Sequence, residues 1–143
     1  MRRSVLILAV LAAAAGAAFY ALRGGEGAAE AFCTTDEVLQ APSGNALRLC
    51  DVVYEVQPSN EAWVVVRVTD PDLDSNQTRA DLGDHDWACE TWGLPALEKE
   101  PRPTRIIVQI MEEPFARGEP APGITQSIEA YSEENATCMW ELL

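Results

Sequence analysis

Short runs of hydrophobic and β-branched residues, some of them alternating with polar ones, follow one another after residue 45. Residues 46–56 (ALRLCDVVYEV) and 62–69 (AWVVVRVT) are typical of β-strands, and the turn sequence QPSN at 57–60 predicts that they form a hairpin. Three later segments have the same character, and the last two predict a C-terminal hairpin. They are residues 105–111 (RIIVQIM), 124–131 (ITQSIEAY) and 137–142 (TCMWEL).

One segment has helical periodicity instead. Apolar residues recur at near-helical spacing within residues 78–92, at Leu82, Cys89 and Trp92. Gly93, followed by Pro95, predicts the end of this helix. The pattern therefore predicts an α+β fold, with a small antiparallel sheet of four or five strands and one main helix packed on a face of the sheet, held by disulfides.

The N-terminal segment has the character of an export signal. Arg2 and Arg3 precede an uncharged apolar run at residues 4–22, which is close to the length of a spanning helix and longer than most signal-peptide cores. The chain thus divides into a signal peptide or N-terminal membrane anchor (1–23), a flexible linker (24–31) and an exported α+β domain (32–143). We expect the domain to be periplasmic, either soluble after signal cleavage or tethered to the inner membrane by residues 4–22.

Charge narrows the possible partners. The chain has 143 residues and a formal net charge of −13, and the part after residue 31 carries 21 acidic and 7 basic residues, a net charge of −14. Such a surface argues against nucleic acid as a partner, because binding the phosphate backbone requires clustered Lys and Arg. The acidity favours a well-solvated exterior.

All four cysteines lie after the apolar run. An even number of cysteines in an exported chain is typical of disulfides, and neither a Cys-x-x-Cys pair nor zinc-ligand spacing is present. Spacing alone does not choose among the three possible pairings. We favour Cys33–Cys50 as a local link and Cys89–Cys138 as a long-range one.

The chain resembles a family of small exported alphaproteobacterial proteins that carry a domain of unknown function. The resemblance covers roughly residues 42–143 and rests on Trp87-Ala-Cys-Glu90 and on a C-terminal pattern of Gln126, then Glu129-Ala-Tyr131, then Cys138-Met-Trp-Glu141. It supports the Cys89–Cys138 pairing, because both cysteines fall in family motifs. The resemblance implies an exported domain but no particular activity. The acidic segment 70–76, Ile128 in place of an aromatic residue, and the Cys33 and Cys50 pair depart from the family pattern.

An acidic segment after the second strand offers a possible cation site. Oxygen-bearing side chains occur at alternate positions, as in calcium loops, at Asp70, Asp72, Asp74, Asn76 and Asp81. Ser75 and Asp81 stand where such loops need Gly and a bidentate Glu. A solvated acidic loop is therefore the favoured interpretation, with Ca²⁺ as the minor alternative and no other cofactor expected.

Other candidates for chemistry are weaker. His85, the only histidine, lies between two aspartates and could act as a general base, but an exposed polar residue near a helix start is the favoured interpretation. We expect the four tryptophans to lie in the core, and no residue is assigned a catalytic role. Glycosidase-like carboxylates could come from Glu90, Glu129 and Glu141, although nothing in their spacing shows that they converge.

The sequence favours a non-enzymatic binding or accessory role in the cell envelope, with an envelope protein or a small ligand as partner. Two alternatives stay open: a small secreted hydrolase with an unrecognised site, and a divalent-cation-binding module.

Overall fold

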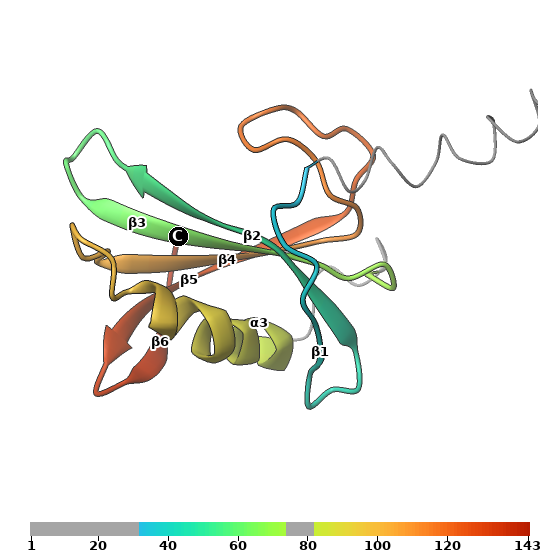
Figure 1. The fold of residues 1–143 in the computed structure, drawn as a ribbon, viewed down its shortest axis with the longest axis horizontal. Helices are drawn as coiled ribbons and strands as arrows, with labels where there is room; N and C mark the ends of the chain where they lie inside the picture. Colours follow the sequence, from blue (N-terminus) through green and yellow to red (C-terminus); the bar gives the residue numbers. More distant parts are fainter. Residues whose placement is uncertain (1–31, 74–81) are drawn as a thin grey trace, which may run out of the picture. The chain divides into compact units, whose positions relative to one another are not determined.

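A computed structural model describes residues 32–73 and 82–143. In this part of the chain, six strands form one sheet, and they lie side by side in the order in which they occur in the sequence (Figure 1). The strands are β1 (Val38–Gln40), β2 (Ala46–Val56), β3 (Ala62–Thr69), β4 (Arg105–Met111), β5 (Gln126–Glu134) and β6 (Thr137–Glu141). The two hairpins predicted from the sequence, β2–β3 and β5–β6, are confirmed.

One helical segment connects β3 to β4. It starts as α3 (Leu82–Ala88), continues as a π-helical turn η1 (Cys89–Gly93), and ends as α4 (Leu94–Ala96). The expected end at Gly93 is wrong by about one turn of helix, because Gly93 keeps helical backbone angles and Pro95 occupies one of the first positions of α4, where proline is tolerated. The expected helix start at residue 78 lies outside the described residues.

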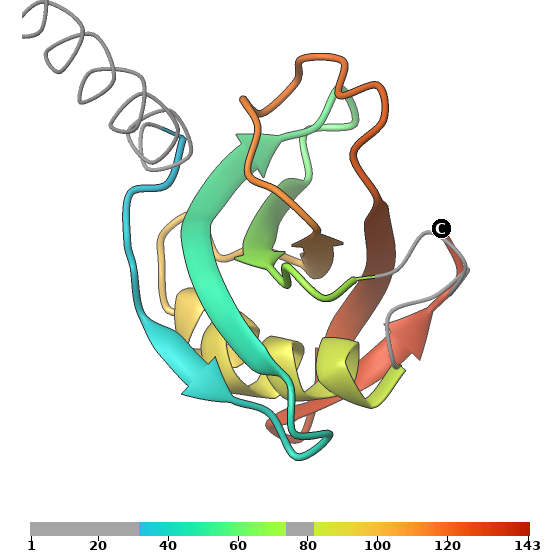
Figure 2. The ribbon, with the colours of Figure 1, turned by 90° about the vertical axis from the view of Figure 1, so that its right-hand side faces the viewer.

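The predicted α+β class with a small antiparallel sheet is wrong. The described chain is mostly sheet, with six strands that curve strongly around one short helical segment (Figure 2). The sheet is also mixed, because β3 and β4 pair in parallel while the other neighbouring strands pair antiparallel. A helical crossover returns the chain to the end of the sheet where β3 began, so β4 must run parallel to β3. Strand β1 was not expected from the sequence, because it has only three residues and therefore gives no clear pattern.

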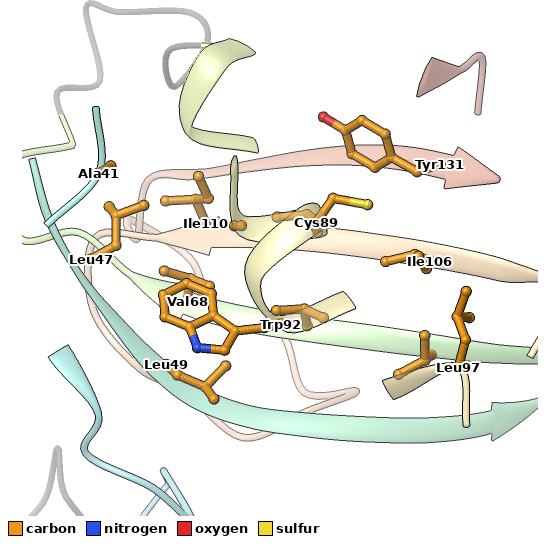
Figure 3. Close-up of a cluster of buried hydrophobic side chains, with 14 of the residues drawn as sticks. Ala41, Leu47, Leu49, Val68, Cys89, Trp92, Leu97, Ile106, Ile110 and Tyr131 are labelled. Carbon is orange, nitrogen blue, oxygen red and sulfur yellow. The ribbon is translucent and has the colours of Figure 1, made fainter. Parts of the chain in front are cut away.

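The main core lies between the concave face of the sheet and the helix. Alternate residues of the central strands point to the helix, among them Val64 and Val68 of β3 and Ile106 and Ile110 of β4, and all four are fully buried. Trp92 packs among them from the helix (Figure 3). The period-two pattern of the strands places these side chains on one face, and their burial supplies most of the driving force for this arrangement.

A bulge in β2 changes which face its side chains occupy. Leu49 pairs with Val68, and Asp51 pairs with the next residue back, Arg67, so Cys50 has no partner in the ladder. Because of this extra residue, Leu49 faces the helix whereas Asp51 faces the convex side of the sheet. The bulge therefore places Asp51 on the opposite face from Leu49, although without it residues two positions apart would share a face.

Two disulfides connect these elements, as favoured from the sequence. Cys33 is bonded to Cys50 in the bulge, and Cys89 at the start of η1 is bonded to Cys138 on β6. Cys50 and Cys89 are fully buried. The second disulfide joins the helix to the last strand across 49 residues of sequence.

The expectation that all four tryptophans lie in the core is only partly correct. Trp92 is buried and its ring packs edge-on against Trp87, but Trp140 on β6 is 51% exposed. None of the helices in the described part of the chain has the length and hydrophobicity of a membrane-spanning segment. The apolar run at residues 4–22 lies outside them, so its role stays a prediction.

Candidate functional site

The acidic loop proposed as a cation site begins directly after β3. Asp70 is buried, and its Oδ1 accepts a hydrogen bond from the backbone N–H of Asp72 at 3.0 Å. Burial raises the pKa of the Asp70 carboxyl. The hydrogen bond from the Asp72 backbone opposes that rise, whereas the negative charges of Asp72 and Asp84 add to it. Asp74, Asn76 and Asp81 lie outside the described residues. In the part of the chain that is described, no three Asp, Glu, His or Cys side chains come together in a group that could hold a metal ion.

The helix brings a histidine and several carboxylates against β5. His85 is fully buried, and its Nε2 lies 3.0 Å from Oγ of Ser127 on β5. Burial holds the pKa of His85 below its ordinary value, while Glu129, Asp84 and Asp86 oppose that shift through their negative charge. These five residues are called the His85 cluster below.

Asp84 connects the cluster to the turn between β1 and β2. Its Oδ2 accepts a hydrogen bond from Asn45 Nδ2 at 2.8 Å, and the side chain is only 1% exposed. Oδ1 of Asp84 and Nδ1 of His85 are buried and have no hydrogen-bond partner among the described residues. Leaving such atoms unpartnered in the interior opposes folding, because they lose their hydrogen bonds to water.

Two aromatic side chains hold the remaining carboxylates of the cluster. Tyr131 on β5 donates its hydroxyl hydrogen to Asp86 Oδ1 at 2.8 Å, and Trp140 on β6 donates its indole N–H to Glu129 Oε2 at 2.6 Å. Burial and the bond to Asp86 raise the pKa of Tyr131. Tyr131 therefore stays protonated and acts as a hydrogen-bond donor between β5 and the helix.

The Ser127–His85 pair has the distance of a nucleophile and its base, but not the full arrangement of a catalytic triad. A neutral imidazole can accept the Ser127 proton, and burial favours that neutral form. A triad also needs a carboxylate on Nδ1 of the histidine, and in the described residues that atom has no partner. The contact holds the helix against β5, and any nucleophilic role would depend on a change at Nδ1.

A second polar cluster lies on the convex face of the sheet, around Arg67 of β3. Arg67 is 1% exposed, and its Nη1 lies 2.8 Å from Asp51 Oδ2. Its Nε donates to Gln109 Oε1 at 3.3 Å, and Nη2 donates to the backbone oxygen of Phe115, whose ring lies under the guanidinium. The Arg67 cluster thus pins the proline-rich segment 112–125 onto the sheet.

A second arginine ties the same segment to β2. Arg117 Nε donates to Glu55 Oε1 at 2.8 Å, and this hydrogen bond lowers the pKa of Glu55. Both arginines pair with carboxylates of β2, and together they hold this segment against the convex face of the sheet.

A half-open groove lies where the helix ends and the β5–β6 hairpin begins. Its volume is about 460 Å³, and its apolar floor includes Leu97 and Ile106. Arg102 and Glu133 form an ion pair at its rim, with Nη2 and Oε2 3.1 Å apart. The groove combines an apolar floor with one charged pair, which suits a small amphipathic group or a side chain of a partner protein.

The expectation that His85 is exposed is wrong, and the sequence patterns did not indicate Ser127 or Arg67. His85 lies on the same helical stripe as Leu82, Cys89 and Trp92, so its position in the helix already contained the signal for burial. Its flanking aspartates suggested exposure instead. The possible carboxylate pair is also absent here: Glu90 is exposed on the helix, and the other two glutamates have separate partners.

These features define a small, disulfide-linked domain with a curved six-stranded sheet around one helical segment. The chain belongs to a family of unknown function, DUF6497, which matches residues 18–143. This agrees with the expected membership of an uncharacterised domain family, while the bacterial group and the C-terminal pattern stay predictions. No curated protein and no solved structure matches the chain.

Proposed function

We propose that the protein is an exported, non-enzymatic binding domain of the cell envelope. The observation that supports export is the pair of disulfides, two of whose cysteines, Cys50 and Cys89, lie fully inside the fold. Buried disulfides of this kind form and persist in oxidising compartments. The basic start and the apolar run at residues 4–22 supply a route to such a compartment.

Export is tested by comparing the full chain with a chain lacking residues 1–31 in a Gram-negative host. The cells are quenched in acid, and free thiols are alkylated in denaturant before the intact mass is measured. We expect the full chain in the envelope fractions with no alkylated cysteine, and the shortened chain in the cytoplasm with alkylated cysteines. A full chain that stays in the cytoplasm with four alkylated cysteines would contradict the proposal.

The groove beside Arg102 is the binding surface that we favour. Its apolar floor and its mixed lining distinguish it from the polar exterior that the net charge of −14 implies. A photo-crosslinking amino acid at exposed Thr104, on the groove rim, should capture a partner in intact cells. The same amino acid at exposed Ser43, in the turn between β1 and β2, is the matched control. Equal capture from both positions, or none from either, would argue against the groove.

A small hydrolase is the second candidate, and the 3.0 Å contact between His85 and Ser127 is the observation that favours it. A fluorophosphonate probe would label Ser127 if this serine were activated by the histidine. Ser127→Ala should then abolish labelling, whereas Ser132→Ala on the convex face of the same strand should not. Absence of labelling in the wild-type protein would leave the binding role as the better account.

A further inference from the structure

In the described part of the chain no strand pairs with the outer edge of β6, and a single charged residue, Glu141, is the strand's only protection against pairing with another chain besides its short length. β6 is the last strand in the sheet order, and its partner strand in the described chain is β5 alone. Its sequence, TCMWE, contains no lysine and no proline. Natural proteins usually protect such an edge with charges, prolines or bulges. The opposite edge strand, β1, has only three residues and offers a much shorter template.

Large apolar side chains are exposed along this edge. Met139 is 44% exposed and Trp140 is 51% exposed, while Leu142 and Leu143, directly after the strand, are 80% and 72% exposed. The indole N–H of Trp140 is held by Glu129, which limits the rotation of the ring. An ordered apolar ring on an open strand is a favourable surface for another strand to cover.

We propose that β6 pairs antiparallel with β6 of a second copy of this chain, with Met139 on the two-fold axis. In this register Met139 lies opposite Met139 of the copy, Cys138 lies opposite Trp140, and Thr137 lies opposite Glu141. Each residue of the strand thus lies opposite a residue of the second copy, and no two residues of like charge lie opposite each other. The pairing joins the two sheets into one and goes beyond the proposed binding role.

Within the two paired strands, no like charges lie opposite each other in this register, although the domain is acidic. Glu141 is the only charged residue of β6, and its Oε2 lies 3.0 Å from Arg105 Nη2 of the same chain. In the proposed register, four residues separate the two Glu141 positions along the strand, so their backbones are about 14 Å apart. That separation exceeds the screening length of about 8 Å at physiological salt.

The apolar face of the pairing also favours a second copy over an unrelated peptide. The two Trp140 rings occupy diagonal positions across the pair, within reach of each other, and each lies opposite the Cys89–Cys138 disulfide of the other chain. Leu142 would continue the pairing opposite Ala136 in the turn between β5 and β6. The same short strand supplies both halves of this contact.

The proposal is tested by sedimentation velocity on the protein purified after expression of the full chain. We expect the wild-type protein to change from monomer to dimer as its concentration is raised from about 1 to about 500 µM, because a small edge-to-edge interface gives a dissociation constant within this range. Met139→Lys and Met139→Glu should each weaken the dimer more than about tenfold, because both place like charges on the axis. An equimolar mixture of the two variants should dimerise again, since the axis then holds opposite charges.

Ile128→Lys is the matched control, because Ile128 is 39% exposed on β5 and lies away from the open edge. This variant should dimerise like the wild type, and circular dichroism should show all variants folded. A wild-type protein that stays monomeric at the highest concentration would overturn the proposal. So would a dimer that Met139→Lys leaves intact, or one that Ile128→Lys weakens equally.

Discussion

The guanidinium of Arg67 and the carboxylate of Asp51 form a buried ion pair with Nη1 and Oδ2 2.8 Å apart, on the side of the sheet opposite the helix. The bulge at Cys50 makes the pair possible, because it turns Asp51 to the convex face while Leu49 stays in the main core. A charge this deeply buried is tolerated only while its partners remain in place. The stability of the convex face therefore depends on the Arg67 cluster.

Replacing Arg67 alone should be strongly destabilising. Arg67→Met leaves Asp51 without its counter-charge and releases the backbone oxygen of Phe115, so we expect the free energy of unfolding to fall by about 3–5 kcal/mol. Urea denaturation followed by tryptophan fluorescence measures the loss. The double variant Arg67→Met/Asp51→Leu should recover part of it, because no buried charge is then left unpaired. A loss below about 1 kcal/mol in the single variant would show that the pair is dispensable.

Stability should fall when the pH is lowered through the range of His85. Burial keeps the pKa of His85 in the folded protein below its ordinary value of 6.5, so just below pH 6.5 the unfolded chain binds more protons than the folded chain. The free energy of unfolding should therefore decrease as the pH falls from about 6.5 towards the pKa of the folded protein, by at most about 1.4 kcal/mol per pH unit.

His85→Gln tests this assignment, because His85 is the only histidine. Urea titrations between pH 5 and pH 7.5 should show a smaller slope in the variant than in the wild type. Asp70, whose pKa is raised by burial, acts in the opposite direction, since its stabilising effect is lost as the pH rises. If the slope were identical in both proteins, His85 would not be the group responsible.

The two disulfides should contribute unequally to stability. Cys89 and Cys138 are 49 residues apart and Cys33 and Cys50 are 17 apart, and in the chain-entropy model these loops correspond to about 4 and about 3 kcal/mol. Paired replacement by alanine, Cys89→Ala/Cys138→Ala against Cys33→Ala/Cys50→Ala, should reproduce that order in urea denaturation. The reverse order would mean that native packing around the bulge outweighs loop entropy.

Local patterns predicted the individual strands better than the way in which they assemble. The runs at 46–56, 62–69 and 105–111 became β2, β3 and β4 with the expected bounds. Whether neighbouring strands pair in parallel or antiparallel depends on the segment that connects them. The helical connection between β3 and β4 makes these two strands parallel, and patterns within single strands do not show this. β1 was missed because three residues carry too little pattern.

The polar clusters were harder to anticipate, because they depend on contacts between distant residues. Ser127 meets His85 from 42 positions away, and Arg67 meets Phe115 from 48 positions away. An arginine inside a hydrophobic strand was visible in the sequence, but the bulge that gives it a carboxylate partner was not. The environment of His85 could have been inferred from its place on the helical stripe.

Gly93 should not tolerate a methyl group, although alanine is the better helix former. A Cβ at this position would lie 2.7 Å from Cγ2 of Ile106 and 3.6 Å from Sγ of Cys89, which is too close to the buried isoleucine. Propensity alone predicts that Gly93→Ala stabilises the helix by about 1 kcal/mol, whereas the clash predicts a loss of about 1–3 kcal/mol. The sign of the change in urea denaturation therefore decides between the two effects, and a stabilised variant would refute the close packing of the helix on β4. Combining Gly93→Ala with Ile106→Ala should cost less than the sum of the two single changes, because Ile106→Ala removes the atom that the new methyl group meets.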